Sequence, residues 1–547
     1  MAVATAKPNQ VDPRLPATAS ANTAIDTVAR YRWLILAGLW AAAVMEVLDT
    51  TIINVALPQM AGNLGATTTE IAWVSTGYIL ANVVILPMTA FLAERFGRKN
   101  YLMFSILLFV VASFFCGLSK SLGEIILWRI LQGAGGAALL STAQGTLRQI
   151  FPASEQGIVQ AIFLLGIIIA PTLGPTLGGW ITDNYTWAWC FYVNIPIGIL
   201  SLFLVGSFLS DPPRKPDAVL PKADWLGISL LAAGLGSLQY VLEEGNKDEW
   251  FESALIVRLT VISVVTLAAL IWWQLSPRNP SPVVNLRVLK NKQFAASLLM
   301  FMALGFGLYG GIYLFPLFAQ TVIHFTPTQT GLALLPGGVA TGVVVMICGA
   351  LLNGKAKVDP RVLIGIGAII FPVSMWMLSH LTTQTGEADV RLALLVRGIG
   401  LGFLFTPLNL VAFGSLKGPE IQQGAGLINL TRQMGGSFGI AVLGTYVTNM
   451  THFHRGHLSE YVYAGNPALL ERQQEHMQLL LAHGYSFAQA QGISLGLISR
   501  TVAEQAMTMA YNNSFTLIML TFFAVSPAIL LLRAPKAAAG GPPADAH

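Results

Sequence analysis

Apolar segments recur along this chain from Trp33 to Leu532, and each is long enough for a helix across the bilayer core, which takes about 20 residues. Of the 547 residues, 54% are hydrophobic and only 10% are charged, whereas a soluble chain carries roughly 25% charged residues. A single soluble core is no alternative, because such cores stop growing near about 250–300 residues. The sequence therefore predicts a membrane protein.

Polar breaks divide the apolar sequence into fourteen segments. Only helices and closed barrels satisfy their backbone in lipid, and unbroken runs of this length indicate helices rather than alternating strands of about 10 residues. The predicted fold class is an all-α membrane protein. The expected spans are 33–57, 72–93, 101–119, 124–147, 157–181, 188–209, 224–243, 254–275, 294–320, 330–352, 360–380, 391–415, 424–449 and 511–533.

The distribution of Lys and Arg predicts the orientation. With the N-terminus inside, most basic residues fall on the cytoplasmic side, and the short outside loops hold little beyond Lys120, Lys247 and Arg391. Both termini should then be cytoplasmic, with polar tails at 1–30, expected to be disordered, and at 534–547. The acidic stretch that begins at Glu243 falls in an outside loop.

Several functional classes are disfavoured. The basic residues are dispersed, which argues against nucleic-acid binding. Cys116, Cys190 and Cys348 lie apart in apolar stretches and fit neither a disulfide framework nor a zinc site. No phosphate-binding GxxxxGK[ST] sequence occurs, and no nucleophile–base or metal constellation stands out. We therefore expect neither an enzyme nor a cofactor, and no catalytic or metal-binding residues.

An internal repeat connects the two halves of the chain. Arg129 is followed 23 residues later by Pro152, and Arg397 is followed 22 residues later by Pro419, with glycines at similar intermediate spacing. Two repeated halves place a substrate site at their interface near the bilayer midplane. The predicted units are a six-helix bundle at 31–210, two inserted helices at 211–280, a second bundle at 281–450 plus 511–533, and an extracytoplasmic segment at 451–510.

Two carboxylates lie three residues apart in the first span, Glu46 and Asp49. A charged group at the bilayer centre costs about 2.5–3.5 kcal/mol on insertion scales, so it marks a functional position. We expect at least one of them to bind and release protons, and Asp49 is preferred because Thr50, Thr51 and Asn54 surround it with polar groups. This hypothesis requires Asp49 to face a water-filled opening. The alternative is a helix contact in which Asp49 bonds to its neighbours.

The connection between spans 2 and 3 carries Glu94, Arg95, Gly97, Arg98 and Lys99. Gly97 permits a tight turn, and the charged groups can hold the cytoplasmic ends of two halves that separate and rejoin. We interpret the cluster as a cytoplasmic gate. The alternative is ordinary anchoring by positive charge on the inside.

Two further spans carry unusual residues. Arg129 lies within an apolar span and needs a carboxylate or carbonyl partner, which Asp49 or Glu46 could supply. Span 5 contains prolines that bend a helix and glycines that permit close packing, so it should be a pliant element at the interface of the halves or a structural kink. These span-5 residues are Pro171, Gly174, Pro175, Gly178 and Gly179.

Together these motifs resemble the major facilitator superfamily, and more narrowly its fourteen-span drug:proton antiporters of the EmrB/QacA subfamily. Residues 48–58 are similar to the first-span signature, whose aspartate is implicated in proton coupling. Residues 92–99 resemble the cytoplasmic-loop motif, although Ala90 and Glu94 replace its first glycine and its aspartate. Arg129, Gln132 and Gly133 match the fourth-span motif associated with proton transfer.

Two other motifs narrow the resemblance. Residues 174–179 match the fifth-span motif typical of exporters, and residues 189–198 resemble the subfamily's sixth span. The resemblance is closest to EmrB-like members, and it implies a bacterial inner-membrane protein that exports drug-like hydrophobic compounds in exchange for protons. The alternatives are a facilitated uniporter, an importer or exporter of one metabolite, a channel, or an integral-membrane enzyme.

The last expectations concern the partner proteins and the residues that line the substrate cavity. EmrB-like pumps work with a periplasmic adaptor and an outer-membrane channel, and residues 451–510 could dock such an adaptor or form a self-packed cap. In that segment Leu469, Leu470, Gln473, Met477 and Leu480 recur with helical spacing. The expected cavity residues are Asn54, Gln132, Tyr309, Tyr313, Phe315, Asn409 and Asn429.

Overall fold

The computed structural model describes residues 15–152, 154–211, 223–353, 358–418, 420–463 and 465–532. Within these ranges the chain forms α-helices and short 3-10 helices and no strand, which confirms the all-α prediction. Helix α1 begins at Leu15, so the tail expected to be disordered is helical in its second half. The alanine-rich sequence before Arg30 favours a helix there.

The N-terminal half and the insertion contain the first eleven α-helices and two short 3-10 helices, η1 and, between α10 and α11, η2 (Trp250–Glu252). Arg98 starts α5 directly after Gly97, whose φ of +90° suits glycine and closes the turn from α4. The helices are α1 (Leu15–Leu64), α2 (Thr68–Ile71), α3 (Trp73–Ile85), η1 (Leu86–Met88), α4 (Thr89–Phe96), α5 (Arg98–Leu118), α6 (Leu122–Ile150), α7 (Gln156–Asn184), α8 (Trp189–Tyr192), α9 (Asn194–Phe208), α10 (Trp225–Glu244) and α11 (Ala254–Leu275).

The C-terminal half starts after a short 3-10 turn. Asn291 caps the first helix by accepting bonds from the backbone N–H groups of Gln293 and Phe294 at 3.1 and 3.3 Å. The helices are α12 (Lys292–Thr321), α13 (Pro327–Asn353), α14 (Pro360–Leu378), α15 (Glu387–Gly414), α16 (Glu420–Ser459), α17 (Pro467–Ala482) and α18 (Phe487–Val525).

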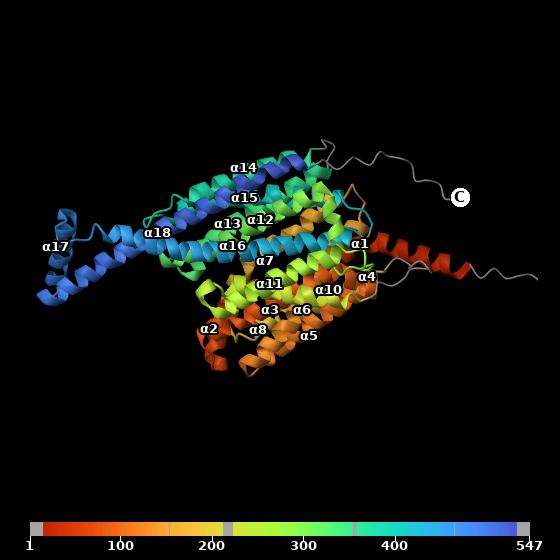
Figure 1. Ribbon diagram of the computed structural model, residues 1–547, viewed down its shortest axis with the longest axis horizontal. Coiled ribbons are helices and arrows are strands. Elements are labelled where there is room, and N and C mark those ends of the chain that lie inside the picture. Colours follow the sequence, from red (N-terminus) through yellow and green to blue (C-terminus); the bar gives the residue numbers. More distant parts are fainter. Residues whose placement is uncertain are drawn as a thin grey trace, which may run out of the picture.

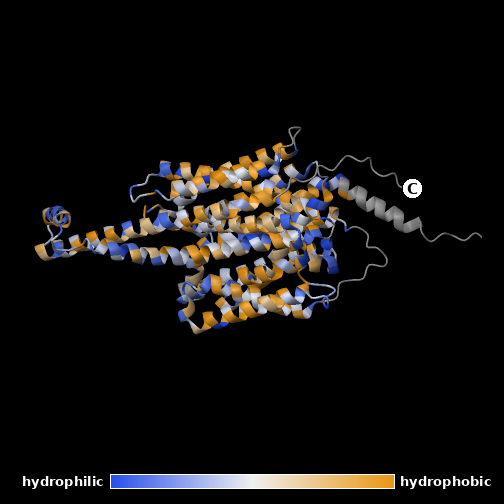
Figure 2. Cartoon of the chain, turned by 45° about the horizontal axis from the view of Figure 1, so that its top comes forward, coloured by the Kyte–Doolittle hydropathy of each residue, from blue (hydrophilic) through white to orange (hydrophobic). Residues whose placement is uncertain are grey.

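Each of the fourteen expected spans falls on a helix of the structure. By length and hydropathy alone, twelve helical segments of the described residues could cross a membrane, and α7 makes thirteen if its two bent parts count as one span. The remaining span is α16, which is more polar but packs along α12 and α18. Apolar side chains are exposed on the outside of the bundle, as Val261, Val264 and Trp272 of α11 illustrate with exposures of 57–66%. Figure 2 shows hydrophobic residues, in orange, along most of the helices of the bundle.

The same helix pairing occurs in both halves. In the first half α1 packs on α7 and α9, and α6 packs on α3 and α5. In the second half α12 packs on α16 and α18, and α15 packs on α13 and α14. Figure 1 shows the early helices, red to yellow, beside the later ones, green to blue. This is the pattern that two repeated bundles produce, and α7 with α13 and α6 with α16 form the interface between them.

The inserted helices α10 and α11 pack on each other, and α10 also contacts α3 of the first bundle and α16 of the second. Gln239 Nε2 donates to Ser437 Oγ at 2.9 Å, and Trp250 Nε1 donates to Thr445 Oγ1 at 2.9 Å. Thr76 Oγ1 donates to Glu244 Oε1 at 3.3 Å. The insertion therefore bridges the two bundles.

The predicted outer segment 451–510 is helical. It comprises the end of α16, all of α17 and the first half of α18, which extend beyond the bundle at the left of Figure 1. Helix α17 lies against α18. Leu469, Gln473, Met477 and Leu480 are half-buried, whereas Leu470 is 42% exposed. We call the end of the bundle that contains the turn between α4 and α5 the α4 end. The opposite end, beyond which α17 lies, is called the α17 end.

Candidate functional site

A buried ion pair joins α1 to α6. Arg129 Nη1 lies 2.6 Å from Asp49 Oδ2, and the two side chains are 1% and 0% exposed. Arg129 Nε donates to the carbonyl of Val74 at 2.9 Å, and its guanidinium lies 4.2 Å from the ring centroid of Tyr78. The partner that the sequence required for Arg129 is therefore Asp49, with a carbonyl and an aromatic face completing its surroundings.

Amide side chains saturate the other oxygen of Asp49. Gln132 Nε2 donates to Asp49 Oδ1 at 2.9 Å, and Asn194 Nδ2 donates to the same atom at 2.7 Å. Gln132 also bonds to Ser113 Oγ and accepts from Arg129 Nη1. A buried charge is tolerated when it is paired and fully hydrogen-bonded. Asp49 thus ties α1, α6 and α9 together.

This geometry contradicts the requirement that Asp49 face a water-filled opening. Asp49 is fully buried, and the cavity between the bundles is lined instead by Glu46, one helical turn earlier. Asn82 Nδ2 donates to Glu46 Oε1 at 3.4 Å, while Glu46 Oε2 has no hydrogen-bond partner. The physical reason is the rotation of α1, which turns Asp49 toward α6 and α9 and Glu46 toward the second bundle.

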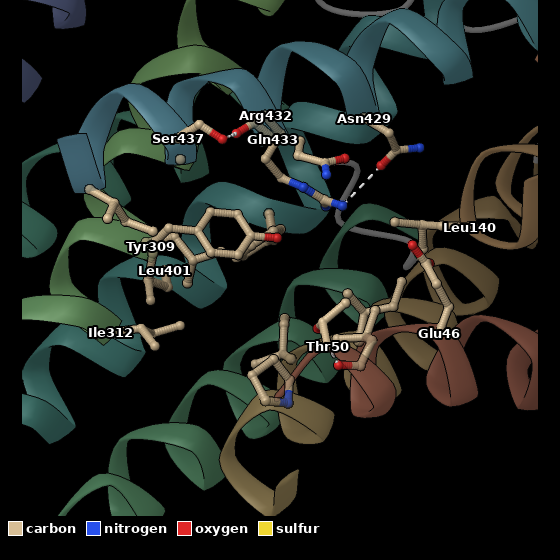
Figure 3. A pocket seen from close by; sticks show the side chains of 18 of the residues that line it. Glu46, Thr50, Leu140, Tyr309, Ile312, Leu401, Asn429, Arg432, Gln433 and Ser437 are labelled. Atoms are coloured by element: carbon tan, nitrogen blue, oxygen red, sulfur yellow. Dashed lines mark hydrogen bonds between the residues drawn. The ribbon is translucent and has the colours of Figure 1, made fainter. Parts of the chain in front are cut away.

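The cavity has largely apolar walls. Its lining includes Ile79, Leu140, Ile167, Leu308, Leu401 and Phe405. Four charged residues interrupt this lining, namely Glu46 of α1, Glu243 of α10, Arg397 of α15 and Arg432 of α16. Figure 3 shows Arg432 and Tyr309 on one side of the cavity and Glu46 and Thr50 on the other. The cavity therefore combines apolar surface with acidic and basic groups held on different helices.

The position of Glu243 differs from the one predicted from the sequence. The sequence places it in an outside acidic loop, but it lies in the last turn of α10 and lines the cavity. Its Oε1 accepts from Gln239 Nε2 at 2.8 Å. The neighbouring Glu244 is buried and bonds to Thr76.

Polar bonds join the two bundles on the α4 side of the cavity. Gln144 of α6 donates to Asn409 Oδ1 at 2.6 Å and accepts from Asn429 Nδ2 at 3.1 Å. Gln144 lies one turn beyond Leu140, which still lines the cavity. The backbone N–H of Gly157 donates to Asn353 Oδ1 at 3.0 Å in the same region. These bonds close the cavity toward the α4 end.

The span-5 motif shapes the contact between α7 and α1. Helix α7 bends by 45° between Pro171 and Leu173, and Pro171 lines the cavity. A Cβ at Gly178 would lie 2.5 Å from the carbonyl oxygen of Ile52, and one at Gly174 would lie 2.0 Å from Thr51 Oγ1. The glycines therefore allow α7 to approach α1 directly beside Asp49.

The loop motif at the α4 end packs within the first bundle. Arg98 Nη1 donates to Gln149 Oε1, and Arg98 Nε lies 3.8 Å from Asp211 Oδ1. The backbone N–H of Lys99 donates to Asp211 Oδ1 at 3.0 Å, and Lys99 Nζ donates to the carbonyl of Gly206 at 2.7 Å. Glu94 and Arg95 lie in α4, which packs against α16 of the other bundle. The gate function of the motif stays a prediction.

The expected cavity residues divide into two groups. Tyr309 and Asn429 line the cavity. Asn54, Gln132, Tyr313, Phe315 and Asn409 are not among its lining residues. Gln132 bonds to Asp49, Asn409 bonds to Gln144, and Phe315 is fully buried in the core. Three charged cavity residues were not expected from the sequence, namely Glu243, Arg397 and Arg432. Arg397 marked the repeat, and both arginines were detectable as charges within expected spans.

Comparisons with known proteins agree with this architecture. A model of the Major Facilitator Superfamily matches residues 39–440. The chain is 32% identical over 510 residues to the fatty acid resistance protein FarB of Neisseria gonorrhoeae, covering 93% of this chain and 97% of FarB. It is 32% identical over 503 residues to the multidrug export protein EmrB of Escherichia coli K12, covering 91% and 95% of the two chains.

A second EmrB, from Haemophilus influenzae, is 34% identical over 436 residues, which cover 79% of this chain and 84% of that protein. Among solved structures, the human organic anion transporter MFSD10 superposes with a TM-score of 0.53 and 11% identity, over 91% of this chain and 99% of that one. At this sequence identity, the similarity to MFSD10 shows only that the two chains share a fold.

The repeated helical bundles around a central cavity define a multi-pass membrane transporter. The chain belongs to the Major Facilitator Superfamily, and EmrB multidrug export proteins are among its relatives.

Proposed function

We propose that the protein exports drug-like, largely apolar compounds from the cytoplasm across the bacterial inner membrane in exchange for protons. The observation that carries this proposal is the position of Glu46, a carboxyl group in the wall of a mostly apolar cavity between two repeated bundles. Relatives named multidrug export proteins support the direction of transport and the class of substrate.

Alternating access supplies the mechanism. The positive-inside rule makes the α4 end cytoplasmic, as are both termini. Substrate enters the cavity from the cytoplasm when the bonds of Gln144 to Asn409 and Asn429 open. Glu46 takes up a proton from the outer side and releases it to the cytoplasm. One charge that moves inward across 100 mV releases about 2.3 kcal/mol, which can drive accumulation of the exported compound.

Glu46 replaces Asp49 as the main proton carrier in this scheme. Asp49 is saturated by Arg129, Gln132 and Asn194, so it positions α1. Glu46 has one oxygen without a partner and borders the cavity. Water that enters the cavity from either side of the membrane reaches Glu46 directly. No cofactor is required, because protons are the coupling ion.

Transport into inverted membrane vesicles tests the proposal. A panel of lipophilic dyes is added with and without a proton gradient, and uptake is followed by fluorescence. We expect gradient-dependent uptake by the wild type and loss of most of that uptake in Glu46→Gln. Glu387→Gln, which removes an exposed carboxylate that pairs with Arg391 and does not line the cavity, should transport like the wild type.

The rival functions predict other results. Uptake that equilibrates and ignores an uncoupler would indicate a facilitated uniporter. Normal gradient-driven uptake by Glu46→Gln would exclude Glu46 as the proton carrier.

The proposal also includes a partner protein that binds at the α17 end. Leu470 and Leu481 share one face of α17 and Leu479 lies on the opposite face, and all three are 42–62% exposed beyond the bundle, where apolar surface benefits from a cover. We propose that this surface docks a periplasmic adaptor protein that connects the transporter to an outer-membrane channel.

A further inference from the structure

The repeated arginines Arg129 and Arg397 have different surroundings. Arg129 pairs with Asp49 at 2.6 Å. Arg397 is 5% exposed, donates from Nη2 to the carbonyl of Leu308 at 3.2 Å and has no partner for its buried Nε. Among the residues that the structure describes, no Asp or Glu forms an ion pair with Arg397. The second bundle therefore keeps the arginine of the repeat without the acid.

Arg432 adds a second cation to the same cavity. It is also 5% exposed, its Nη2 donates to Asn429 Oδ1 at 2.9 Å, and its buried Nε has no partner. Both arginines line the cavity from the second bundle. Within the described part of the chain Arg432 likewise forms no ion pair with an Asp or Glu. Figure 3 shows it across the cavity from Glu46.

Unpaired buried charges are costly. Removal of one partner of a buried ion pair destabilises a protein strongly, because an uncompensated charge remains. A cation that is nine-tenths buried and borders a cavity can be compensated by an anion that enters the cavity. The guanidinium group suits planar oxyanions, since its N–H groups form two parallel bonds to a carboxylate.

We propose that Arg397, with Arg432 in the same wall, forms an anion-binding subsite for the carboxylate of an amphipathic substrate whose hydrocarbon part occupies the apolar remainder of the cavity. This inference rests on the proposed function, because it assigns a substrate class to the same cavity. Leu308, Leu394 and Leu401 lie in the same lining as Arg397 and supply the apolar surface. The carboxylate of such a substrate neutralises the charge of Arg397, and its hydrocarbon part is buried against the apolar lining of the cavity.

The competing occupants are the carboxylates of the protein itself. Glu46 and Glu243 line the same cavity, and closure of the bundles could bring one of them to an arginine. In that case the cavity would show no preference for an anionic ligand. A comparison of ligands that differ only in charge separates the two possibilities.

The test measures equilibrium binding to the full-length protein in nanodiscs of neutral phosphatidylcholine, with empty nanodiscs as blank. The probes are 4-octylbenzoate, its primary amide and the 4-octylbenzyltrimethylammonium cation. We expect the wild type to bind the carboxylate at least tenfold more tightly than the amide. Arg397→Gln should lose this preference and keep the affinity for the amide, and Arg397→Lys should retain part of the preference. Arg361→Gln removes an exposed arginine outside the cavity and should change nothing.

Equal affinities for carboxylate and amide in the wild type would overturn the inference, as would a carboxylate preference that survives both Arg397→Gln and Arg432→Gln. A variant that fails to fold loses all ligands alike, and Arg397→Lys then decides by comparison of its carboxylate and amide affinities. Failure of the proposed function gives a different result, in which none of the three probes binds to the wild type and vesicles show no dye transport.

Discussion

Arg129 Nη1 lies 2.6 Å from Asp49 Oδ2 in the interior of the bundle, where the two side chains are 1% and 0% exposed. The pair connects α1 and α6, and Asn194 adds α9 through its bond to Asp49 Oδ1. The buried pair and this bond therefore connect three helices of the first bundle.

Removal of one partner of this pair should destabilise the protein. We expect Asp49→Asn to lower the free energy of unfolding by about 3–5 kcal/mol, because Arg129 would remain buried without a counter-charge. Thermal unfolding of the detergent-purified protein measures the effect. The double variant Asp49→Asn with Arg129→Gln should recover much of the loss. An unfolding midpoint of Asp49→Asn equal to that of the wild type would show that the pair is not structural.

Two adjacent glycines of α7 provide a matched pair for the next prediction. A Cβ at Gly178 would lie 2.5 Å from the carbonyl oxygen of Ile52, whereas a Cβ at Gly179 would lie 3.9 Å from Val55 Cγ1. Gly178→Ala should therefore separate α7 from α1 at a cost of about 1–3 kcal/mol. Gly179→Ala should be neutral or stabilising by up to about 1 kcal/mol, because alanine favours a helix. Unfolding midpoints and dye transport of both variants check this, and similar losses in both would refute the packing argument.

The spans and the repeated architecture follow from the sequence because apolar length and the spacing of Arg129 and Arg397 are local properties. The need of Arg129 for a counter-charge was also predictable, since an intramembrane arginine requires one. The sequence did not determine which of Glu46 and Asp49 faces the cavity. Residues three apart lie on one broad face of a helix, and only the packing of α1 against α6, α7 and α9 fixes the rotation of that face.

The bonds between the halves could not be predicted for a related reason. Gln144, Asn409 and Asn429 meet across more than 260 residues of sequence, and each alone is an ordinary polar residue in a helix. Glu243 was misplaced because an acidic run at the end of an apolar segment is typical of a loop. In the structure α10 continues through Glu244, and contacts with Thr76 and Ser437 hold this helix at the cavity.

Loss of the Gln144 bonds should shift the protein toward opening at the α4 end. Gln144→Ala removes the bonds to Asn409 and Asn429, and each hydrogen bond contributes about 0.5–1.5 kcal/mol. A reporter cysteine at Leu140 should then react severalfold faster with a membrane-impermeant thiol reagent applied from the α4 side. Thr146→Ala, which loses only a bond to its own helix at Thr142, serves as the control. Unchanged reactivity in Gln144→Ala would mean that other contacts close this end.

The exposed leucines of α17 give a prediction that separates assembly from transport. Replacement of Leu470, Leu479 and Leu481 together by lysine should abolish binding of the proposed periplasmic adaptor, because charged side chains cannot replace the apolar contact. Dye uptake by inverted vesicles should remain, since no residue of α17 lines the cavity and α17 lies beyond the bundle in Figure 1. Alanine at Arg472 and Glu475, an exposed ion pair on the same helix, should leave both properties intact. Co-purification with the adaptor and vesicle transport are measured in parallel. If the triple variant still retains the adaptor, another surface docks it, and if it loses transport as well, α17 contributes to the transport cycle itself.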